Sequence, residues 1–127
     1  MNESDFKRKL TKEQYKVLRE KSTEAPFTSE LLKNKQSGSY VCAACGQVLF
    51  ASDAKFDSGT GWPSFDKPSN VKNIILQEDS SHGMKRIEVM CKNCKSHLGH
   101  VFPDGPTNTK QRFCINGCAL EFKKGKK

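Results

Sequence analysis

The sequence predicts a mainly β domain, a small antiparallel sandwich or barrel, with short helices at its N-terminus. Short apolar runs of strand length follow one another from residue 40 onward, separated by clusters of Gly, Pro, Asn and Asp. The first 37 residues instead place apolar side chains near helical spacing. Two Cys-x-x-Cys pairs indicate a structural zinc site, which would stabilise a domain whose hydrophobic core is of modest size.

The 127 residues suit one domain, and contents of 35% hydrophobic and 28% charged residues are typical of a globular protein. We divide the chain into three parts. We expect residues 1–37 to form a helical lead-in that packs on the domain, residues 38–122 to form the main β domain, and residues 123–127 to form a basic disordered tail.

The lead-in contains two helical segments. Thr11 and Gln14 resemble a capping box at the start of the first segment. Pro26 interrupts the pattern, and the run over 28–33 predicts a second short helix. From residue 40 onward we expect strands over residues 40–42, 48–50, 71–77, 86–91 and 111–122.

Charge and hydropathy narrow the classes of function. The net charge of +8 divides into +3 over residues 1–37, +1 over 38–111 and +4 over 112–127, so the middle of the chain is nearly neutral. This distribution favours a solubilising tail over a nucleic-acid groove. No apolar stretch approaches the roughly 20 residues of a membrane span, and the N-terminus lacks an apolar signal region. We expect a cytoplasmic monomer without nucleic-acid or membrane partners.

Four of the six cysteines form the pattern of a metal site. Cys42 and Cys45, and likewise Cys91 and Cys94, are separated by two residues, a spacing that turns both thiolates of a pair toward one point. Four protein ligands close a tetrahedral zinc site, so we expect one structural Zn²⁺ per chain. The alternative is that one pair is a thioredoxin-like redox motif, but no βαβ pattern follows either pair.

The remaining cysteines, Cys114 and Cys118, are candidates for redox chemistry. On a strand over 112–116, alternation places Arg112, Cys114 and Asn116 on one face, and a guanidinium beside a thiol favours the nucleophilic thiolate. Four extended residues span about 13 Å, whereas a disulfide needs Cα atoms within about 7 Å. The chain must therefore turn after Cys114, and we expect Gly117 to act as the hinge. The alternative is that both cysteines are small buried hydrophobes.

Three motifs resemble the B-type methionine sulfoxide reductases: residues 59–65 (GTGWPSF), 96–106 (SHLGHVFPDGP) and 112–116 (RFCIN). The resemblance covers about residues 7–122. It implies two small antiparallel sheets in a barrel-like arrangement, Cys114 as nucleophile, and reduction of the R epimer of methionine sulfoxide in proteins. Many members of the family carry a resolving cysteine where this chain has Thr60, so we expect Cys118 to take that role here.

The motifs supply a substrate pocket and proton donors. Trp62 offers a flat apolar wall for the substrate methyl group, and Phe65 and Phe102 are expected to complete the pocket. His97 and His100 resemble the active-site histidines of the family and can deliver a proton to the sulfoxide oxygen. Both can face inward only if the strand is irregular between them. The alternative is a catalytic metal held by the two histidines, but the sequence offers no evident third ligand. His82 is expected at the surface.

The resulting hypothesis is a cycle through a Cys114 sulfenic acid and a Cys114–Cys118 disulfide, which a thioredoxin-like dithiol reduces. Two alternatives remain open. One is a non-catalytic, zinc-ribbon-like binding module for RNA or an acidic partner, and the other is a zinc redox sensor that ejects its metal on oxidation. Nucleic-acid affinity without reductase activity would favour the first, and zinc release under peroxide would favour the second.

Overall fold

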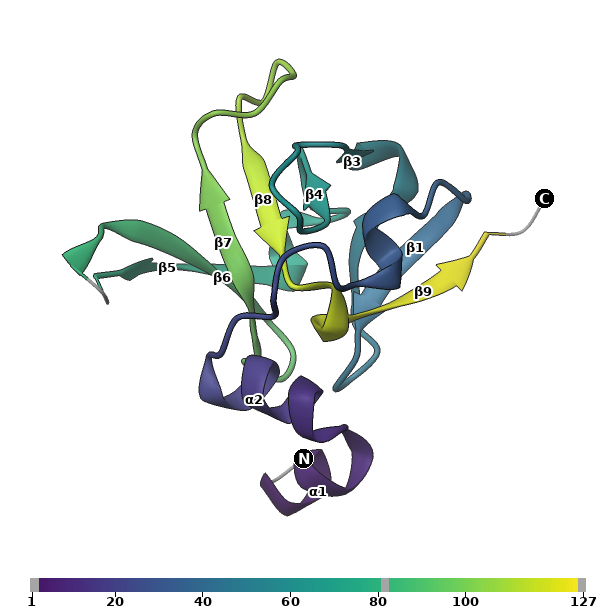
Figure 1. Ribbon diagram of the computed structural model, residues 1–127, viewed down its shortest axis with the longest axis vertical. Helices are drawn as coiled ribbons and strands as arrows, with labels where there is room; N and C mark the ends of the chain where they lie inside the picture. The colour runs from purple at the N-terminus through teal and green to yellow at the C-terminus, as the bar shows by residue number, and fades with distance from the viewer. Residues whose placement is uncertain (1–2, 81–82, 126–127) are drawn as a thin grey trace.

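Two α-helices open the part of the chain that the computed structural model describes, residues 3–80 and 83–125. α1 (Glu3–Lys9) and α2 (Lys12–Glu20) lie together at one end of the molecule (Figure 1). The predicted capping box is confirmed, because the Thr11 side chain accepts from the Gln14 backbone and the Gln14 side chain accepts from the Thr11 backbone. None of the helices in the described ranges is long and apolar enough to cross a membrane.

A connecting segment leads from α2 to the first strand. Lys21 adopts a left-handed conformation (φ 61°) and ends α2 five residues before Pro26. The predicted second helix forms as a short 3-10 helix, η1 (Glu30–Lys33), whose first turn is capped by the Ser29 hydroxyl. Residues 21–29 of this segment run along the sheets close to the turn that precedes the last strand (Figure 1).

The strands form two antiparallel sheets, as predicted. The smaller sheet has the order β2-β1-β9, from β2 (Val48–Ala51), β1 (Gly38–Cys42) and β9 (Leu120–Lys124). The larger has the order β3-β4-β8-β7-β6-β5, from β3 (Lys55–Phe56), β4 (Ser64–Phe65), β8 (Arg112–Ile115), β7 (His97–Phe102), β6 (Arg86–Cys91) and β5 (Ile74–Asp79). Short 3-10 helices occur between strands: η2 (Ser52–Ala54), η3 (Val71–Asn73) and η5 (Gly117–Ala119).

Two strand predictions and the prediction of a disordered tail need correction. The strand expected over 111–122 is divided, because η5 separates β8 from β9 and sends them to different sheets. The strand expected over 71–77 begins at Ile74, after a 3-10 turn. β9 continues through Lys124, where it pairs with β1, so the first two residues of the expected disordered tail are in a sheet. Residues 126–127 of that tail, and His82, lie outside the described residues.

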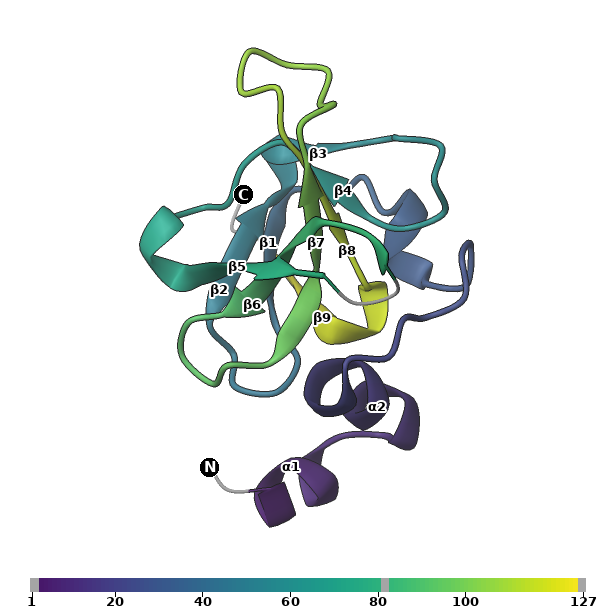
Figure 2. The same ribbon diagram turned by 90° about the vertical axis from the view of Figure 1, so that its left-hand side faces the viewer.

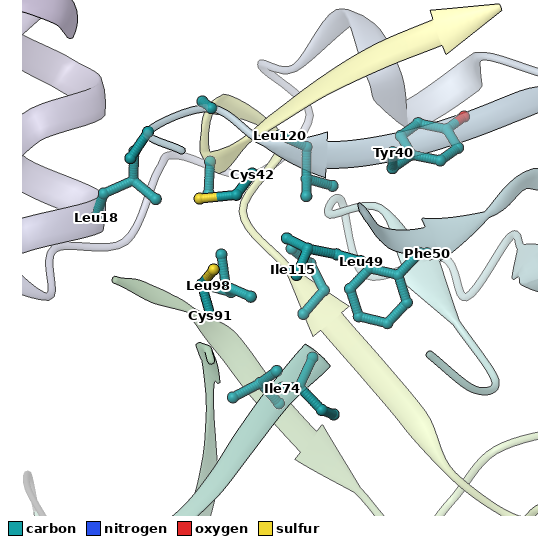
Figure 3. Packing of buried hydrophobic residues seen from close by; sticks show 14 of the residues in the cluster. Leu18, Tyr40, Cys42, Leu49, Phe50, Ile74, Cys91, Leu98, Ile115 and Leu120 are labelled. Atoms are coloured by element: carbon teal, nitrogen blue, oxygen red, sulfur yellow. The ribbon is translucent and has the colours of Figure 1, made fainter. Parts of the chain in front are cut away.

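The core lies between the two sheets (Figure 3). Its aromatic centre is fully buried, with the rings of Phe50 and Phe65 stacked 4.4 Å apart and Tyr40 edge-on to Phe65 at 5.1 Å. Leu18 from α2 extends the core toward the helices (Figure 3). The loop that joins β7 to β8 projects from the opposite end of the molecule (Figure 2).

Candidate functional site

The four predicted metal ligands lie together at the junction of the two sheets. Cys42 ends β1 of the smaller sheet and Cys91 ends β6 of the larger sheet, and the two side chains approach one another (Figure 3). Cys45 and Cys94 complete the cluster, and the four sulfurs lie within 4.8 Å of one another. The Cys42–Cys94 and Cys45–Cys91 sulfur distances are 3.7 Å and 3.5 Å. Tetrahedral zinc with Zn–S bonds of about 2.3 Å places its sulfurs about 3.8 Å apart, so the cluster fits a metal ion.

The two cysteine pairs have the same backbone geometry. The amide of Gly46 donates to the carbonyl of Cys42, and the amide of Lys95 donates to the carbonyl of Cys91, both at 2.8 Å. Gly46 (φ 83°) and Lys95 (φ 63°) both adopt the left-handed conformation that such a tight turn requires. Hydrogen bonds to Cys91 and Cys94 raise the pKa of Cys42, so four thiolates this close need a cation to be charged together.

A second site surrounds Cys114 on β8. A cavity of about 110 Å³ brings this cysteine together with predicted pocket and catalytic residues. Its lining consists of Thr23, Trp62, Arg86, His100, Phe102, Cys114 and Asn116. Strand alternation is confirmed here, because Phe113 and Ile115 point into the core and Cys114 points out of it.

Opposing effects set the pKa of Cys114. Burial raises the pKa of its thiol, whereas the charge of Arg112 and side-chain hydrogen bonds with Thr60 and Arg112 lower it, with a net increase. The predicted influence of Arg112 is therefore present but smaller than desolvation. The guanidinium makes two hydrogen bonds to Asp104 (2.8 and 3.2 Å) and stacks on Phe102 at 4.4 Å, which fixes its position beside Cys114.

The two histidines of β7 come together through the predicted irregularity. The pairing of β6 with β7 shifts register between Val89 and Met90, so both rings lie on one side with their centres 5.5 Å apart. His100 lines the Cys114 cavity, and its Nε2 is hydrogen-bonded to Asp79 at 2.8 Å. His97 lies behind it, 4% exposed. Burial lowers the pKa of His97, and its bond to Glu88 opposes that shift.

Trp62 and Asn116 are held by hydrogen bonds to the backbone. The indole Nε1 of Trp62 donates to the carbonyl of Glu24 at 3.0 Å. The Asn116 side chain is buried, donates to the carbonyl of Leu98 at 2.9 Å and accepts from the amide of Glu24 at 3.0 Å. Asn116 therefore lines the Cys114 cavity while one of its two N–H groups holds the strand beside it.

Cys118 opens into a different cavity from Cys114. This second cavity, about 470 Å³, lies beside the 28–31 segment and is lined by four carboxylates, those of Glu13, Glu24, Glu30 and Glu121. Burial raises the pKa of Cys118 to about 12, and the charges of Glu24 and Glu13 act in the same direction. The predicted turn after Cys114 is present as η5, which begins at Gly117.

One residue prediction needs correction. Phe65 does not line the Cys114 cavity, because β4 points its ring into the core against Phe50 and leaves it 0% exposed. Gly117 does not have the positive φ that would by itself require glycine, and its role as a hinge stays a prediction. A Cβ added there would lie 1.9 Å from the hydroxyl of Ser29, so close packing, rather than backbone freedom, requires glycine.

Comparison with known proteins assigns the family. The family model described as "SelR domain" matches residues 10–124. A protein of Methanosarcina mazei named "Peptide methionine sulfoxide reductase MsrB" is 58% identical over 97% of this chain and 88% of its own length. A protein of the same name from Leptospira interrogans is 54% identical over 97% and 94%. "Methionine-R-sulfoxide reductase B2, mitochondrial" of Rattus norvegicus is 51% identical over 99% and 76%.

The chain belongs to the MsrB family. In this MsrB chain, Thr60 stands at the position where we expect many family members to carry a resolving cysteine. The structure places the Thr60 side chain against Cys114. The Thr60 hydroxyl is also hydrogen-bonded to Ser58 at 2.7 Å. Position 60 is therefore adjacent to Cys114, the expected nucleophile, while Cys118 opens into the other cavity.

Sequence reasoning missed the carboxylates of this MsrB site. Glu88 contacts His97, Asp79 contacts His100, and Glu24 contacts the Asn116–Cys118 segment. Glu88 carries a weak signal, since a charged residue stands in a strand among apolar neighbours. Asp79 and Glu24 carry none, because each follows or precedes polar residues in a stretch that resembles surface.

Proposed function

We propose that this chain reduces methionine (R)-sulfoxide in proteins to methionine, with Cys114 as the nucleophile. The observation that carries the proposal is the single cavity that joins Cys114 to Trp62, Phe102 and His100. The two aromatic rings offer an apolar wall for the substrate methyl group, and the imidazole offers a partner for the sulfoxide oxygen. The cavity of about 110 Å³ is far smaller than the roughly 300–1,000 Å³ of whole-ligand pockets, so it suits the end of one side chain.

The first step transfers oxygen from substrate to enzyme. The sulfur of Cys114 attacks the sulfoxide sulfur, the substrate S–O bond breaks, and an S–O bond forms on Cys114. The substrate sulfur is reduced to the thioether, Cys114 is oxidised to the sulfenic acid, and the transferred oxygen takes up one proton, which balances the proton that the Cys114 thiol loses when it becomes the thiolate. Arg112, held by Asp104, favours the thiolate that begins the attack.

We assign proton delivery to His100, assisted by His97. Nε2 of His100 is hydrogen-bonded to Asp79, so Nδ1 is the ring nitrogen left to donate a proton to the sulfoxide oxygen. His97 is fixed by Glu88 and packs edge-on against His100, so its role is to hold that ring in place. Asn116 orients the end of the strand that carries the nucleophile.

Cys118 is our candidate for the resolving cysteine. Its thiol attacks the Cys114 sulfenic acid, an S–S bond forms, and water leaves with the thiol proton. A thioredoxin-like dithiol then reduces this disulfide by exchange, and its own sulfurs are oxidised. Because the two cysteines open into different cavities, this step requires the η5 turn to move.

We propose zinc as the metal of the four-cysteine cluster. Four cysteine sulfurs at a spacing close to a tetrahedral edge suit Zn²⁺, and a set of four protein ligands leaves no position for substrate. Cys42, Cys45, Cys91 and Cys94 would hold the ion, which contributes folding energy to the junction of the two sheets.

The cycle also bears on compartment and assembly. None of the six cysteines is in a disulfide, and the mechanism consumes reducing equivalents, so we place the chain in the cytoplasm, where thiols stay reduced. We propose a monomer, because a single chain already brings together the thiol, the aromatic wall and the imidazole of the Cys114 cavity.

The test is turnover of the separate R and S epimers of dabsylated methionine sulfoxide with dithiothreitol, for the native protein, Cys114→Ser and Cys118→Ser. The expected result is activity on the R epimer alone that disappears in Cys114→Ser. Cys118→Ser is expected to keep the dithiothreitol reaction and to lose most of the reaction supported by thioredoxin. A folded, metal-loaded protein inactive on both epimers would refute the proposal.

A further inference from the structure

Glu24 is a buried carboxylate in a segment that is otherwise exposed. Glu24 is only 5% exposed, whereas all seven of the other residues from Lys21 to Thr28, a stretch described without gaps, are exposed to solvent. Its carboxylate accepts hydrogen bonds from two consecutive backbone amides, those of Gly117 at 2.7 Å and Cys118 at 3.0 Å. A charged group that leaves water needs such partners, so these two bonds fix the segment to the η5 turn.

The backbone of the same residue holds two walls of the Cys114 cavity. The amide of Glu24 donates to the side chain of Asn116, and its carbonyl accepts from the indole of Trp62, both at 3.0 Å. Trp62 and Asn116 lie 54 residues apart in the sequence and share this one anchor. Because the side chain fixes the backbone, a change at the carboxylate will be transmitted to both walls.

We propose that Glu24 is a positioning residue that places Trp62 and Asn116 around Cys114 and holds Cys118 in the closed η5 turn while the enzyme is reduced. The proposal deepens the proposed function and rests on it for the roles of Cys114 and Cys118. The reasoning follows from the two cavities. Cys118 can approach Cys114 only if the turn moves, and the turn cannot move without breaking both bonds to Glu24.

The surroundings of Cys118 act in the same direction. Burial, and then the charges of Glu24 and Glu13, raise the pKa of this thiol, and Glu30 and Glu121 line the same cavity. In the closed turn Cys118 is therefore protonated and a poor nucleophile. Release from Glu24 exposes the thiol and separates it from the nearest carboxylate, so the second cysteine becomes reactive only after the turn opens.

The test compares Glu24→Gln with the matched control Glu13→Gln. Both substitutions remove one negative charge beside Cys118, but only the first removes an acceptor of the Gly117 and Cys118 amides. Alkylation of Cys118 by iodoacetamide at pH 8, followed by mass spectrometry, is expected to be about tenfold faster in Glu24→Gln, the effect of losing one charge-assisted hydrogen bond. Glu13→Gln is expected to stay within about twofold of the native rate, since its carboxylate is exposed and screened.

Two further readouts separate positioning from loss of fold. Trp62 is the one tryptophan of the chain, so its emission reports its own surroundings, and we expect it to shift in Glu24→Gln alone. With dithiothreitol as reductant, KM for the sulfoxide is expected to rise several-fold more than kcat falls. A folded Glu24→Gln protein that matches Glu13→Gln in alkylation, emission and KM would overturn the proposal. The first two readouts need no turnover, so they decide it even if the proposed activity fails.

Hydrogen exchange of the native protein provides a test without substitution. The amides of Gly117 and Cys118 are expected to exchange slowly in the reduced protein and to lose that protection once the Cys114–Cys118 disulfide has formed. Free exchange in the reduced protein, or protection that persists in the disulfide form, would show that Glu24 does not hold the turn. This experiment keeps the proposal testable if Glu24→Gln fails to fold.

Discussion

Replacing Gly117 by alanine tests the packing between the connecting segment and the η5 turn. A Cβ at position 117 would lie 1.9 Å from the Ser29 hydroxyl oxygen and 2.2 Å from the Ser29 Cβ, so the obstacle is one side chain. The next nearest atom is Oε2 of Glu24 at 3.3 Å, a distance that small shifts can accommodate. Gly117→Ala is therefore expected to destabilise the protein, and removal of the Ser29 side chain is expected to restore most of the loss.

The magnitude follows from overpacking of a closely packed contact. An added methyl group that forces its neighbours to move costs about 1–3 kcal/mol of unfolding free energy. Ser29→Gly removes a cap from η1, but glycine at an N-cap costs only a few tenths of a kcal/mol. In Gly117→Ala/Ser29→Gly, the loss is expected to fall below the sum of the single losses by about 1–2 kcal/mol, the coupling typical of residues in direct contact.

Urea unfolding of the metal-loaded protein, followed by Trp62 emission, measures all three variants. With m of about 1–3 kcal/mol per M, Gly117→Ala alone moves the midpoint by about 1 M. The result that refutes the reasoning is additivity. If glycine were needed for backbone freedom rather than space, the double variant would be as unstable as the sum of its two parts. A Gly117→Ala midpoint equal to that of the native protein would also refute it.

Three other predictions concern the thiols. Thr60→Cys in the Cys118→Ser background places a thiol beside Cys114, so thioredoxin-supported turnover is expected to recover at least partly. A variant that cannot form a disulfide between Cys114 and the cysteine at position 60 would contradict this geometry. Because the pKa of Cys118 is raised to about 12 in the folded protein, the unfolded chain loses this proton first as pH rises. The free energy of unfolding is therefore expected to fall above about pH 9, and to fall less in Cys118→Ser. Urea unfolding at about pH 7 and pH 10 measures both changes. A strong chelator under mild urea is expected to unfold the native protein cooperatively by circular dichroism, and an unchanged transition after complete metal loss would refute a structural role for the cluster.

Much of the fold was predictable because its signals are local. The Thr11–Gln14 capping box, the knuckle spacing of the cysteines and the alternation around Cys114 each depend on residues fewer than five positions apart. The division of 111–122 into two strands occurs at η5, where Gly117 packs closely against Ser29, 88 residues earlier. A continuous apolar run gives no sign of such a contact, so the two strands were predicted as one.

The candidate site divides in the same way. Cys114, Trp62, His100 and Phe102 were predicted from motifs and lie in one cavity, whereas Phe65 was assigned to the pocket although its strand face belongs to the core. The carboxylates that position these groups were not predictable. The contacts of Glu24 with the Asn116–Cys118 segment span 92 to 94 residues, and no short pattern contains both partners.

The metal cluster and the catalytic cavity are separate in chemistry but connected through β6 and β7. Cys91 ends β6, and Glu88, three residues earlier on that strand, holds His97. The knuckle that follows Cys91 leads directly into β7, where the register shift between Val89 and Met90 turns both histidines to one side. A metal ion bound by Cys91 and Cys94 would therefore also fix the register on which the two carboxylate–histidine pairs depend. Removal of such an ion is therefore expected to displace the imidazoles from Cys114, although none of the four cysteines of the cluster lines the cavity.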